Sequence, residues 1–294
     1  GLTTAQMAAL ETRDLIALRT SQIIALTTAQ AAALTTAQIP TLTTAQMAAL
    51  ETTDLQALST AQIVALNSAQ VSALSTGQTA TLTTTQIAAL ETGDLQALRT
   101  AQIIALTTAQ AAALTTDQVP RLTTAQMAAL ETADLQAFST AQIAALTTSQ
   151  VAALRTSQTA ALTTAQTAVL QQSTLSSAQI AGFTTAQIAA LTSDQIAALN
   201  TRAIAALRTD QIVALSSTQV SALTTGQLPV LTTGQITAIE SSDLATLSTA
   251  QIVTLSSAQV SALTTGQIAG LTTAQMAALE TRDLIALRTS QIIA

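Results

Sequence analysis

The sequence predicts an all-α repeat solenoid of very short capped helices, with one helix in each eight-residue repeat. Three observations support this prediction. An octad, first seen at residues 3–10 (TTAQMAAL), recurs along the whole chain. Its restricted and its variable positions fall on opposite sides of a helix. Its first residues carry hydroxyl groups suited to capping a helix. A short fixed period of this kind indicates an extended array rather than an ordinary globular domain.

The octads form two runs, separated by five residues that do not fit the repeat. The first run occupies residues 1–170, the irregular insert is 171–175, and the second run occupies 176–294. We therefore expect one continuous octapeptide-repeat solenoid with a single interruption. The insert keeps Leu175 in a core-like place, so it is expected to form a bulge or seam in the stack.

The eight positions of the octad, numbered from 1 (Thr3 in the first copy) to 8 (Leu10), differ in how much they vary between copies. Position 2 is always Thr or Ser, and position 4 is Gln or Asp except at Ala203. Position 5 is usually a large aliphatic residue, and position 8 is Leu except at Phe138, Phe183 and Ile239. At about 100° per residue, the restricted positions 4, 5, 7 and 8 share one helix face. We expect restricted positions to face the interior, with the two Phe as packing variants.

Each octad is expected to start with a capped helix and to end at a corner made by positions 8, 1 and 2. A hydroxyl at position 2 can cap a backbone N–H two or three residues later, a contribution of about 1 kcal/mol. Thr at position 1 with Gln at position 4 also fits a capping box. A helix of one and a half turns is not stable alone, so the octads must stack. The Gln amide is expected to satisfy backbone groups of adjacent coils.

A β-solenoid is the alternative fold. Pro40, Pro120 and Pro229 fall at position 6, near the middle of the expected helix, where proline is costly. Gly is absent from position 1, where a turn that ends a helix often needs it. Rungs of Thr, Ile and Val with stacked Gln would suit strands. The abundance of Ala and the scarcity of Asn, Asp and Gly at corners argue against strands.

A variant octad with Glu at position 1 and Asp at position 4 recurs every 40 residues within each run. The resulting acidic pairs are Glu11/Asp14, Glu51/Asp54, Glu91/Asp94, Glu131/Asp134, Glu240/Asp243 and Glu280/Asp283. This period of five octads indicates a duplicated block and is a candidate for one superhelical turn. Residues 1–25 and 270–294 are identical, which suggests a segment of a longer array whose uncapped ends contact more of the same protein.

The composition offers little for catalysis or cofactor binding. His, Cys, Tyr and Trp are absent and all nine basic residues are Arg, so the usual general bases and most activated nucleophiles are missing. We expect no enzyme activity and no catalytic, cofactor-binding or metal-binding residues. The acidic pairs could form weak Ca²⁺ sites, but two carboxylates fall short of the roughly six to eight oxygen ligands required. Solvated turns with Asp at a helix start are the favoured interpretation.

Charge and hydropathy restrict the partners and the location. A net charge of −6 without a basic patch argues against nucleic acid and anionic membranes. No apolar run reaches the ~18–20 residues of a membrane span, and the absence of Cys is compatible with export. Arg19, Arg99 and Arg288 each follow a Glu by eight residues. If successive octads lie side by side, these charges pair and help to set the register.

Runs such as residues 183–199 (FTTAQIAALTSDQIAAL) resemble the octapeptide arrays of very large secreted or surface, adhesin-like proteins of Gram-negative bacteria. The resemblance implies an extracellular structural or adhesive role and carries over no functional residue. We therefore expect a structural protein that forms a bacterial surface fibre, filament or stalk by associating with itself, end to end and laterally. No membrane insertion is expected, and a cell or surface receptor stays unidentified. The alternative is an adhesive, ice-binding or ligand-binding solenoid that presents rows of Thr.

Overall fold

In the computed structural model, which describes residues 1–293, every octad forms one short helix. The helices are α-helices of four to six residues, except in the three proline-containing octads, which use 3₁₀ geometry. No strand occurs in the described residues. The all-α repeat solenoid is thus confirmed, and the β-solenoid alternative is wrong. The chain divides into two compact units, unit 1 at Gly1–Leu154 and unit 2 at Arg155–Ala294.

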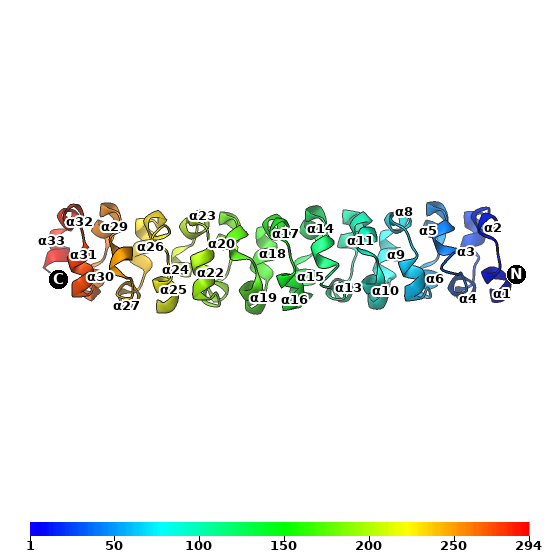
Figure 1. Ribbon diagram of the computed structural model, residues 1–294, viewed down its shortest axis with the longest axis horizontal. Helices are drawn as coiled ribbons and strands as arrows, with labels where there is room; N and C mark the ends of the chain where they lie inside the picture. Colours follow the sequence, from blue (N-terminus) through cyan, green and yellow to red (C-terminus); the bar gives the residue numbers. More distant parts are fainter. Residues whose placement is uncertain (294) are drawn as a thin grey trace. The chain divides into compact units, whose positions relative to one another are not determined.

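Unit 1 contains α1 to α17 and two 3₁₀ helices, whose order along the unit can be followed in Figure 1. Their bounds are α1 Thr4–Ala8, α2 Thr12–Ile16, α3 Thr20–Ile24, α4 Thr28–Ala32, η1 Ile39–Thr41, α5 Thr44–Ala49, α6 Thr52–Gln56, α7 Thr60–Val64, α8 Ser68–Ala73, α9 Thr76–Thr81, α10 Thr84–Ala89, α11 Thr92–Ala97, α12 Thr100–Ile104, α13 Thr108–Ala112, η2 Val119–Arg121, α14 Thr124–Ala129, α15 Thr132–Ala137, α16 Thr140–Ala144 and α17 Thr148–Ala153.

Unit 2 contains α18 to α33 and two further 3₁₀ helices, one of them in the five-residue insert. Their bounds are α18 Thr156–Ala161, α19 Thr164–Val169, η3 Gln172–Thr174, α20 Ser177–Gly182, α21 Thr185–Ala189, α22 Ser193–Ala198, α23 Thr201–Ala205, α24 Thr209–Val213, α25 Ser217–Ser221, η4 Leu228–Val230, α26 Thr233–Ala238, α27 Ser241–Leu244, α28 Thr249–Ile252, α29 Ser257–Ala262, α30 Thr265–Gly270, α31 Thr273–Ala278, α32 Thr281–Ala286 and α33 Thr289–Ile292.

Each α-helix begins directly after position 1, which is the N-cap. In the octad at 83–90, the hydroxyl of Thr83 accepts the backbone N–H of Gln86 at 3.1 Å. The side-chain oxygen of Gln86 accepts the backbone N–H of Thr83 at 2.8 Å, which completes a capping box. The expected capping box is confirmed. The expectation that position 2 supplies the cap is wrong, because the corner comes one residue earlier and position 2 is already helical.

The helices end without a left-handed residue. After α10 the chain runs extended through Leu90 (φ −58°, ψ 133°) and into the next N-cap, Glu91 (φ −64°, ψ 149°). None of the residues in the described chain has a positive φ. Because this corner never enters the region that favours Gly, the absence of Gly from position 1 is no obstacle to short helices.

Proline at position 6 is accommodated by a tighter helix. In the octad at 35–42, the N–H groups of Gln38 and Ile39 both donate to the carbonyl of Thr35 at 3.0 Å. The chain then closes η1 with a bond from Thr41 N–H to the Gln38 carbonyl at 3.0 Å. These bonds omit the N–H that Pro40 lacks, so the expected cost of a proline inside an α-helix is avoided.

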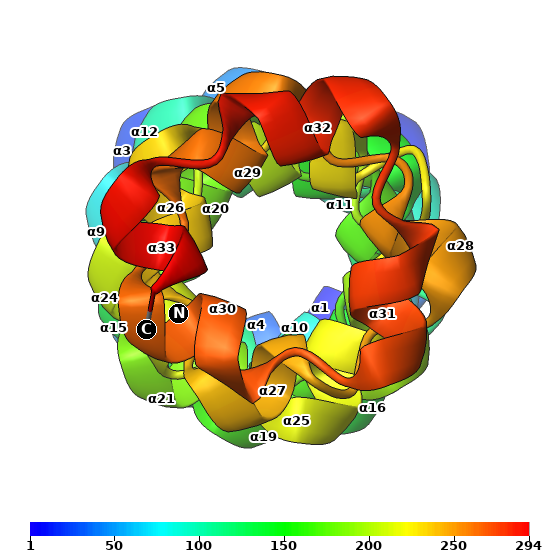
Figure 2. The ribbon, with the colours of Figure 1, turned by 90° about the vertical axis from the view of Figure 1, so that its left-hand side faces the viewer.

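The helices wind so that every third helix comes back into contact. In unit 1, α5 packs on α8 and α8 packs on α11. Figure 2 shows the same step in the last turn of unit 2, where the chain passes from α30 through α31 and α32 and brings α33 beside α30. A turn of the coil therefore closes between the third and the fourth octad. The expectation that five octads make one turn is wrong.

Positions 4, 5 and 8 of the octads form the interior of each unit. In the octad at 83–90, Gln86, Ile87 and Leu90 are at most 3% exposed, whereas positions 1 to 3 are exposed. Phe138 and Phe183 are buried at position 8, which confirms them as packing variants. The prediction that restricted positions face the interior therefore holds for positions 4, 5 and 8. Position 7, for example Ala89, is only half-buried, and the prediction is wrong for position 2.

Candidate functional site

The Gln side chain at position 4 joins each turn of the coil to the turn before it. Nε2 of Gln86 donates to the backbone carbonyls of Leu55 at 2.9 Å, Leu58 at 2.8 Å and Gln56 at 3.2 Å. These carbonyls belong to positions 5, 8 and 6 of the octad four places earlier. Since the Gln86 oxygen already accepts the N–H of Thr83, the buried amide is used at both ends. We call this set of bonds the amide interlock.

The amide interlock recurs through both units with the same spacing, to carbonyls 28 or 31 residues earlier. In unit 1 it is made by Gln30, Gln38, Gln46, Gln62, Gln70, Gln78, Gln86, Gln102, Gln110, Gln118, Gln126, Gln142 and Gln150. In unit 2 it is made by Gln211, Gln219, Gln227, Gln235, Gln251, Gln259, Gln267, Gln275 and Gln291.

The interlock solves a problem that every short helix creates. The last carbonyls of a helix have no partner within it, and in a helix of about one turn these are most of the carbonyls. A buried carbonyl without a donor costs about 1–3 kcal/mol. The Gln of a later octad supplies that donor, so the prediction that its amide satisfies backbone groups of adjacent coils is confirmed.

Asp replaces Gln at position 4 in six octads, which we call Asp octads. Five of these aspartates are buried, namely Asp54, Asp94, Asp134, Asp243 and Asp283, whereas Asp14 is exposed. All five lie in the first turn of a helix, as expected. The interpretation as solvated turns is wrong at these five positions, because the preceding turn of the coil covers the start of each helix.

Each buried Asp bonds to a different octad from the one that Gln reaches. Oδ1 of Asp94 accepts the hydroxyl of Ser68 at 2.6 Å, and Oδ1 of Asp54 accepts the hydroxyl of Thr28 at 2.9 Å. Both hydroxyls come from position 2 of the octad three places earlier. The same pairing joins Thr108 to Asp134, Ser217 to Asp243 and Ser257 to Asp283. The hydroxyl at position 2, although exposed, thus has a partner in these turns.

The second carboxyl oxygen lacks a comparable bond in several Asp octads. Oδ2 of Asp54, Asp94 and Asp283 is buried and has no hydrogen-bond partner in the described part of the chain. In Asp134 this oxygen accepts the N–H of Glu131 at the long distance of 3.4 Å. Burial raises the pKa of Asp134, against the opposing hydrogen bonds from Thr108 and from the Glu131 N–H.

The ion pairs of the described residues lie within single octads. Arg13 contacts Glu11 at 2.9 Å, and the exposed Arg208 contacts Asp210 at 3.0 Å and lowers the pKa of that carboxyl. The expected pairing of Glu11, Glu91 and Glu280 with Arg19, Arg99 and Arg288 is wrong. Successive octads are not side by side; octads three places apart are.

The five-residue insert lies inside unit 2 and takes the place of a whole octad. Gln187 donates to the carbonyls of Thr159 at 3.2 Å and Leu162 at 2.7 Å, which lie 28 and 25 residues earlier instead of 31 and 28. Three residues are therefore missing from this turn, but the sequence of helices around it is kept. Within the insert, Gln172 donates to the carbonyls of Thr167 and Leu170 directly before it.

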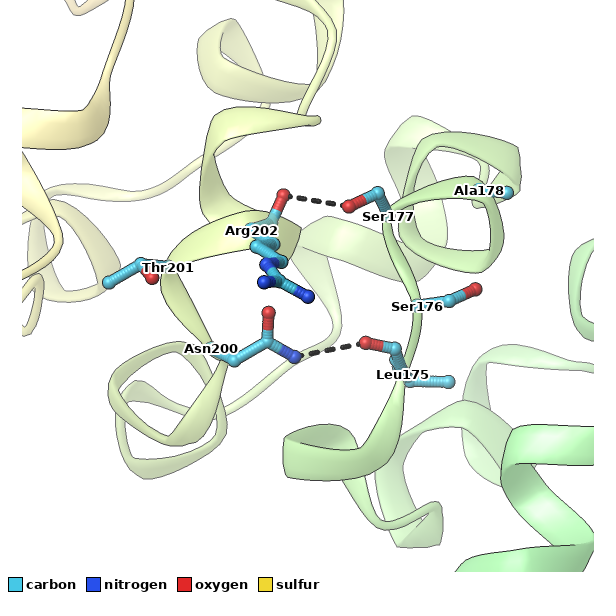
Figure 3. Close-up of a pocket in the computed structure, with 7 residues that line it drawn as sticks. All are labelled: Leu175, Ser176, Ser177, Ala178, Asn200, Thr201 and Arg202. Carbon is cyan, nitrogen blue, oxygen red and sulfur yellow. Dashed lines mark hydrogen bonds between the residues drawn. The ribbon is translucent and has the colours of Figure 1, made fainter.

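The five-residue insert, which we call the seam, explains why Ala203 is the one residue at position 4 that is neither Gln nor Asp. Counted in helices, α23 lies four places after η3, so a Gln at 203 would face the insert instead of a regular octad. Ala203 is fully buried there and makes no side-chain bond. Asn200 supplies the missing donor: its amide donates to the carbonyl of Leu175 at 3.0 Å (Figure 3). Its side-chain oxygen accepts the N–H of Ala203 at 2.9 Å.

A cavity of about 570 Å³ lies at the seam, between residues 175–178 and 200–202 (Figure 3). The hydroxyl of Ser177 donates to the carbonyl of Arg202 at 3.1 Å, and Asn200 is engaged with Leu175. The guanidinium of Arg202 extends into the gap, but it is exposed and stands alone among these groups. The cavity presents no converging set of polar groups, and we interpret it as the space left by the three missing residues.

A family model described as the ALTTAQ repeat matches seven successive segments of the chain. The segments are residues 7–44, 47–84, 87–124, 127–170, 173–201, 200–233 and 236–273. The chain belongs to the ALTTAQ-repeat family. A comparison with curated proteins finds no match. The predicted octapeptide-repeat array is thereby confirmed, while the kind of protein that carries the array stays a prediction.

The ALTTAQ phrase can be read directly in the structure. At residues 105–110 it covers the end of one octad, the extended corner and the start of α13. Leu106 is buried, Thr107 is the N-cap, and Gln110 donates to the carbonyls of Thr79 and Leu82. The phrase thus contains the corner, the cap and the amide interlock, which are the parts that build an ALTTAQ coil.

Clustered metal ligands and membrane-spanning helices are both lacking in residues 1–293 of the ALTTAQ chain. No group of three or more His, Cys, Asp or Glu side chains is arranged to hold a metal ion there. Within the same residues, no helix is both long enough and apolar enough to cross a bilayer. The absence of catalytic, cofactor-binding and metal-binding residues stays a prediction.

Proposed function

We propose that this ALTTAQ-repeat chain is a structural protein that builds an extracellular fibre, filament or stalk on a bacterial surface. The observation that carries this proposal is the amide interlock. An octad with Gln at position 4 both donates and accepts this contact: Gln86 donates to the octad four places earlier, and the carbonyls of Ile87 and Leu90 accept from Gln118 four places later. A unit that both gives and receives the same contact can be repeated to any length.

The direction of these bonds suits a load-bearing element. The interlock joins residues that are 28 to 31 apart in sequence but lie in successive turns. Separating two turns requires the loss of several amide–carbonyl bonds and the exposure of the Leu and Ile residues between them. Each such bond contributes about 0.5–1.5 kcal/mol, and their number grows with the length of the coil.

The chemistry of the surface supports a structural rather than a catalytic role. Exposed positions 1 to 3 carry mainly Thr, Ser and Ala, and many of the position 1 hydroxyls are occupied as helix caps. The chain has no His or Cys to activate them. The partner in this proposal is the protein itself, both end to end and laterally. The absence of Cys and the resemblance to surface arrays support an extracellular location.

The assembly is tested by electron microscopy of the purified chain and of a version with twice as many octads. We expect uniform threads of constant width whose unit length doubles with the number of octads. A version in which Gln70, Gln78, Gln86 and Gln110 are replaced by Ala should lose the threads. Compact particles whose length does not follow the number of octads would contradict a fibre.

The location is tested separately, by labelling intact cells of the source bacterium with antibodies against the octads. Surface labelling without permeabilisation is expected. Labelling only after the cells are opened would remove the extracellular part of the proposal and leave the fibre untouched.

A further inference from the structure

The Asp octads leave a gap in the amide interlock, with a polar atom on each side of it. In the register that Gln uses, Asp94 faces the octad 59–66, and Asp134 faces 99–106. The backbone carbonyls of Leu66 and Leu106, the 28-residue partners in this register, receive no hydrogen bond in the described chain. Oδ2 of Asp94 is also without a partner. Both atoms are acceptors, and no donor connects them.

Solvent does not fill the gap. Asp94 is 5% exposed and its Oδ2 is inaccessible to a water molecule. Asp54 repeats the arrangement one block earlier, with a buried, unpartnered Oδ2 and the carbonyl of Leu26 without a donor. An acceptor facing acceptors in a dry interior is an unfavourable state. One proton on the carboxylate would supply the missing donor.

We propose that the buried aspartates Asp54, Asp94 and Asp134 are proton-binding sites that complete the interlock when the pH falls. A proton transferred from hydronium to the carboxylate gives a neutral carboxyl and water. The new O–H then supplies the donor that the carbonyls four octads earlier lack, while Oδ1 keeps its Ser or Thr hydroxyl. An Asp octad thus joins the turns reversibly, whereas a Gln octad joins them permanently.

Few charged groups surround the three sites. The elements packed most closely on α6, α11 and α15 are α4, α8, α9, α13 and η2, and the one charged residue in these elements is Arg121. The other charged groups nearby are the N-cap residues Glu51, Glu91 and Glu131, and Arg19 and Arg99 at the start of the octads four places before Asp54 and Asp134. Negative charge adjoins all three sites directly.

The sign of the effect follows from Asp134. Burial is the largest cause that raises its pKa above 3.8, and the charge of Glu131 acts in the same direction. A raised pKa in the folded state means that the contribution to stability is complete below the unfolded value, and that it is lost as the pH rises through the folded value. Acidification from neutral pH should therefore tighten the coil. The exposed Asp210 has a pKa lowered from 3.8. Its contribution to stability has the opposite sign, because it is lost as the pH falls below 3.8.

The test is hydrogen exchange of the full chain at about pH 7 and about pH 5, corrected for intrinsic rates. In the natural sequence, protection of the Asp octads and of the octads four places before them should rise on acidification. If each local opening releases one proton, the protection factor can rise by at most about tenfold for each unit by which the pH falls. The variant Asp54→Gln/Asp94→Gln/Asp134→Gln should be well protected at both pH values. The matched control Asp14→Gln/Asp117→Gln changes exposed residues and should behave like the natural sequence.

Two outcomes would overturn the proposal: protection of the Asp octads that falls on acidification, or a triple variant that keeps the natural pH dependence. Infrared spectroscopy of the natural chain does not depend on the variants. We expect the band of a protonated carboxyl in the folded chain at a pH where exposed carboxyls are ionised, and its loss on unfolding. No such band would contradict neutral aspartates. These results are independent of whether the chain forms fibres.

Discussion

The octad at 83–90 in unit 1 and the octad at 200–207 in unit 2 differ at one decisive position. Gln86 donates to three carbonyls of the octad four places earlier, whereas Ala203 is buried and donates to none. Both residues lie in the first turn of helices of nearly the same length. What differs is the segment they face: a regular octad for Gln86 and the five-residue insert for Ala203. Position 4 therefore depends on the backbone of an earlier turn as well as on the cap of its own helix.

The largest expected effect comes from breaking the regular side of this comparison. Gln86→Ala removes the donor from the carbonyls of Leu55 and Leu58 and leaves the Thr83 N–H without its acceptor. We expect a loss of about 3 kcal/mol, since each buried unpaired group costs about 1–3 kcal/mol. Denaturant unfolding gives the total, and hydrogen exchange should localise it to residues 51–58 and 83–90.

The matched control for this change is Gln96→Ala. Gln96 is exposed, and its amide bonds only to the carbonyl of Arg121. We expect a change within about 0.5 kcal/mol. Equal losses for the buried and the exposed Gln would mean that the interlock adds nothing beyond the loss of a Gln side chain.

The reverse substitution sharpens the comparison at the seam. Ala203→Gln restores the residue that most other octads carry, but it buries an amide where no regular octad supplies carbonyls. We expect a loss of about 2 kcal/mol, the cost of burying an unpaired amide. The measurement is the unfolding midpoint of the full chain. A gain in stability would show that Gln at position 4 is favourable wherever it stands.

A smaller effect separates the two hydroxyls that begin an octad. Thr43 caps α5 by accepting the N–H of Gln46 at 3.2 Å, whereas the next residue, Thr44, is exposed at the first helical position. We expect Thr43→Ala to cost about 1 kcal/mol. Thr44→Ala should stay within about 0.5 kcal/mol. Thermal unfolding measures the stability of the two variants. A larger loss of stability for Thr44→Ala would show that position 2, and not position 1, supplies the cap.

The smallest effect concerns the surface of unit 2, outside the interlock. Arg208→Ala removes the hydrogen bonds that lower the pKa of Asp210. The pKa of Asp210 should then move up toward 3.8, as followed by carboxyl NMR titration. The loss of stability should stay within about 1 kcal/mol, because the exposed ion pair contributes little and the other bonds lost are those from Arg208 to the carbonyls of Ala181 and Phe183.

Helix type, capping and burial could be predicted from the octad because they depend on neighbouring residues. The angle that places positions 4, 5 and 8 on one face, and the Thr-x-x-Gln box, are local properties that Thr83 and Gln86 show directly. The use of Gln as a donor to other coils also followed from the rule that buried polar groups are satisfied.

The number of octads per turn could not be predicted in the same way. It depends on the backbone angles of the corner, such as those of Leu90 and Glu91, and small changes there accumulate over a turn. Without that number, the partner of each octad is unknown. The burial of Asp94 and the failure of Arg99 to meet Glu91 both follow from contact with the third octad instead of the next.

The role of Ala203 was hidden for a related reason. Its explanation requires the insert to count as one place in the turn, although it has five residues instead of eight. Only the bonds of Gln187 and Asn200 reveal that count.

The most direct measurement of the amide interlock is the set of nuclear Overhauser contacts made by a single Gln side-chain amide. A chain labelled segmentally at residues 83–90 allows the Nε2 protons of Gln86 to be observed without overlap from other octads. We expect contacts with residues 55–58, four octads earlier. Contacts with residues 75–82 or 91–98, and none with 55–58, would contradict the interlock and the coil built on it.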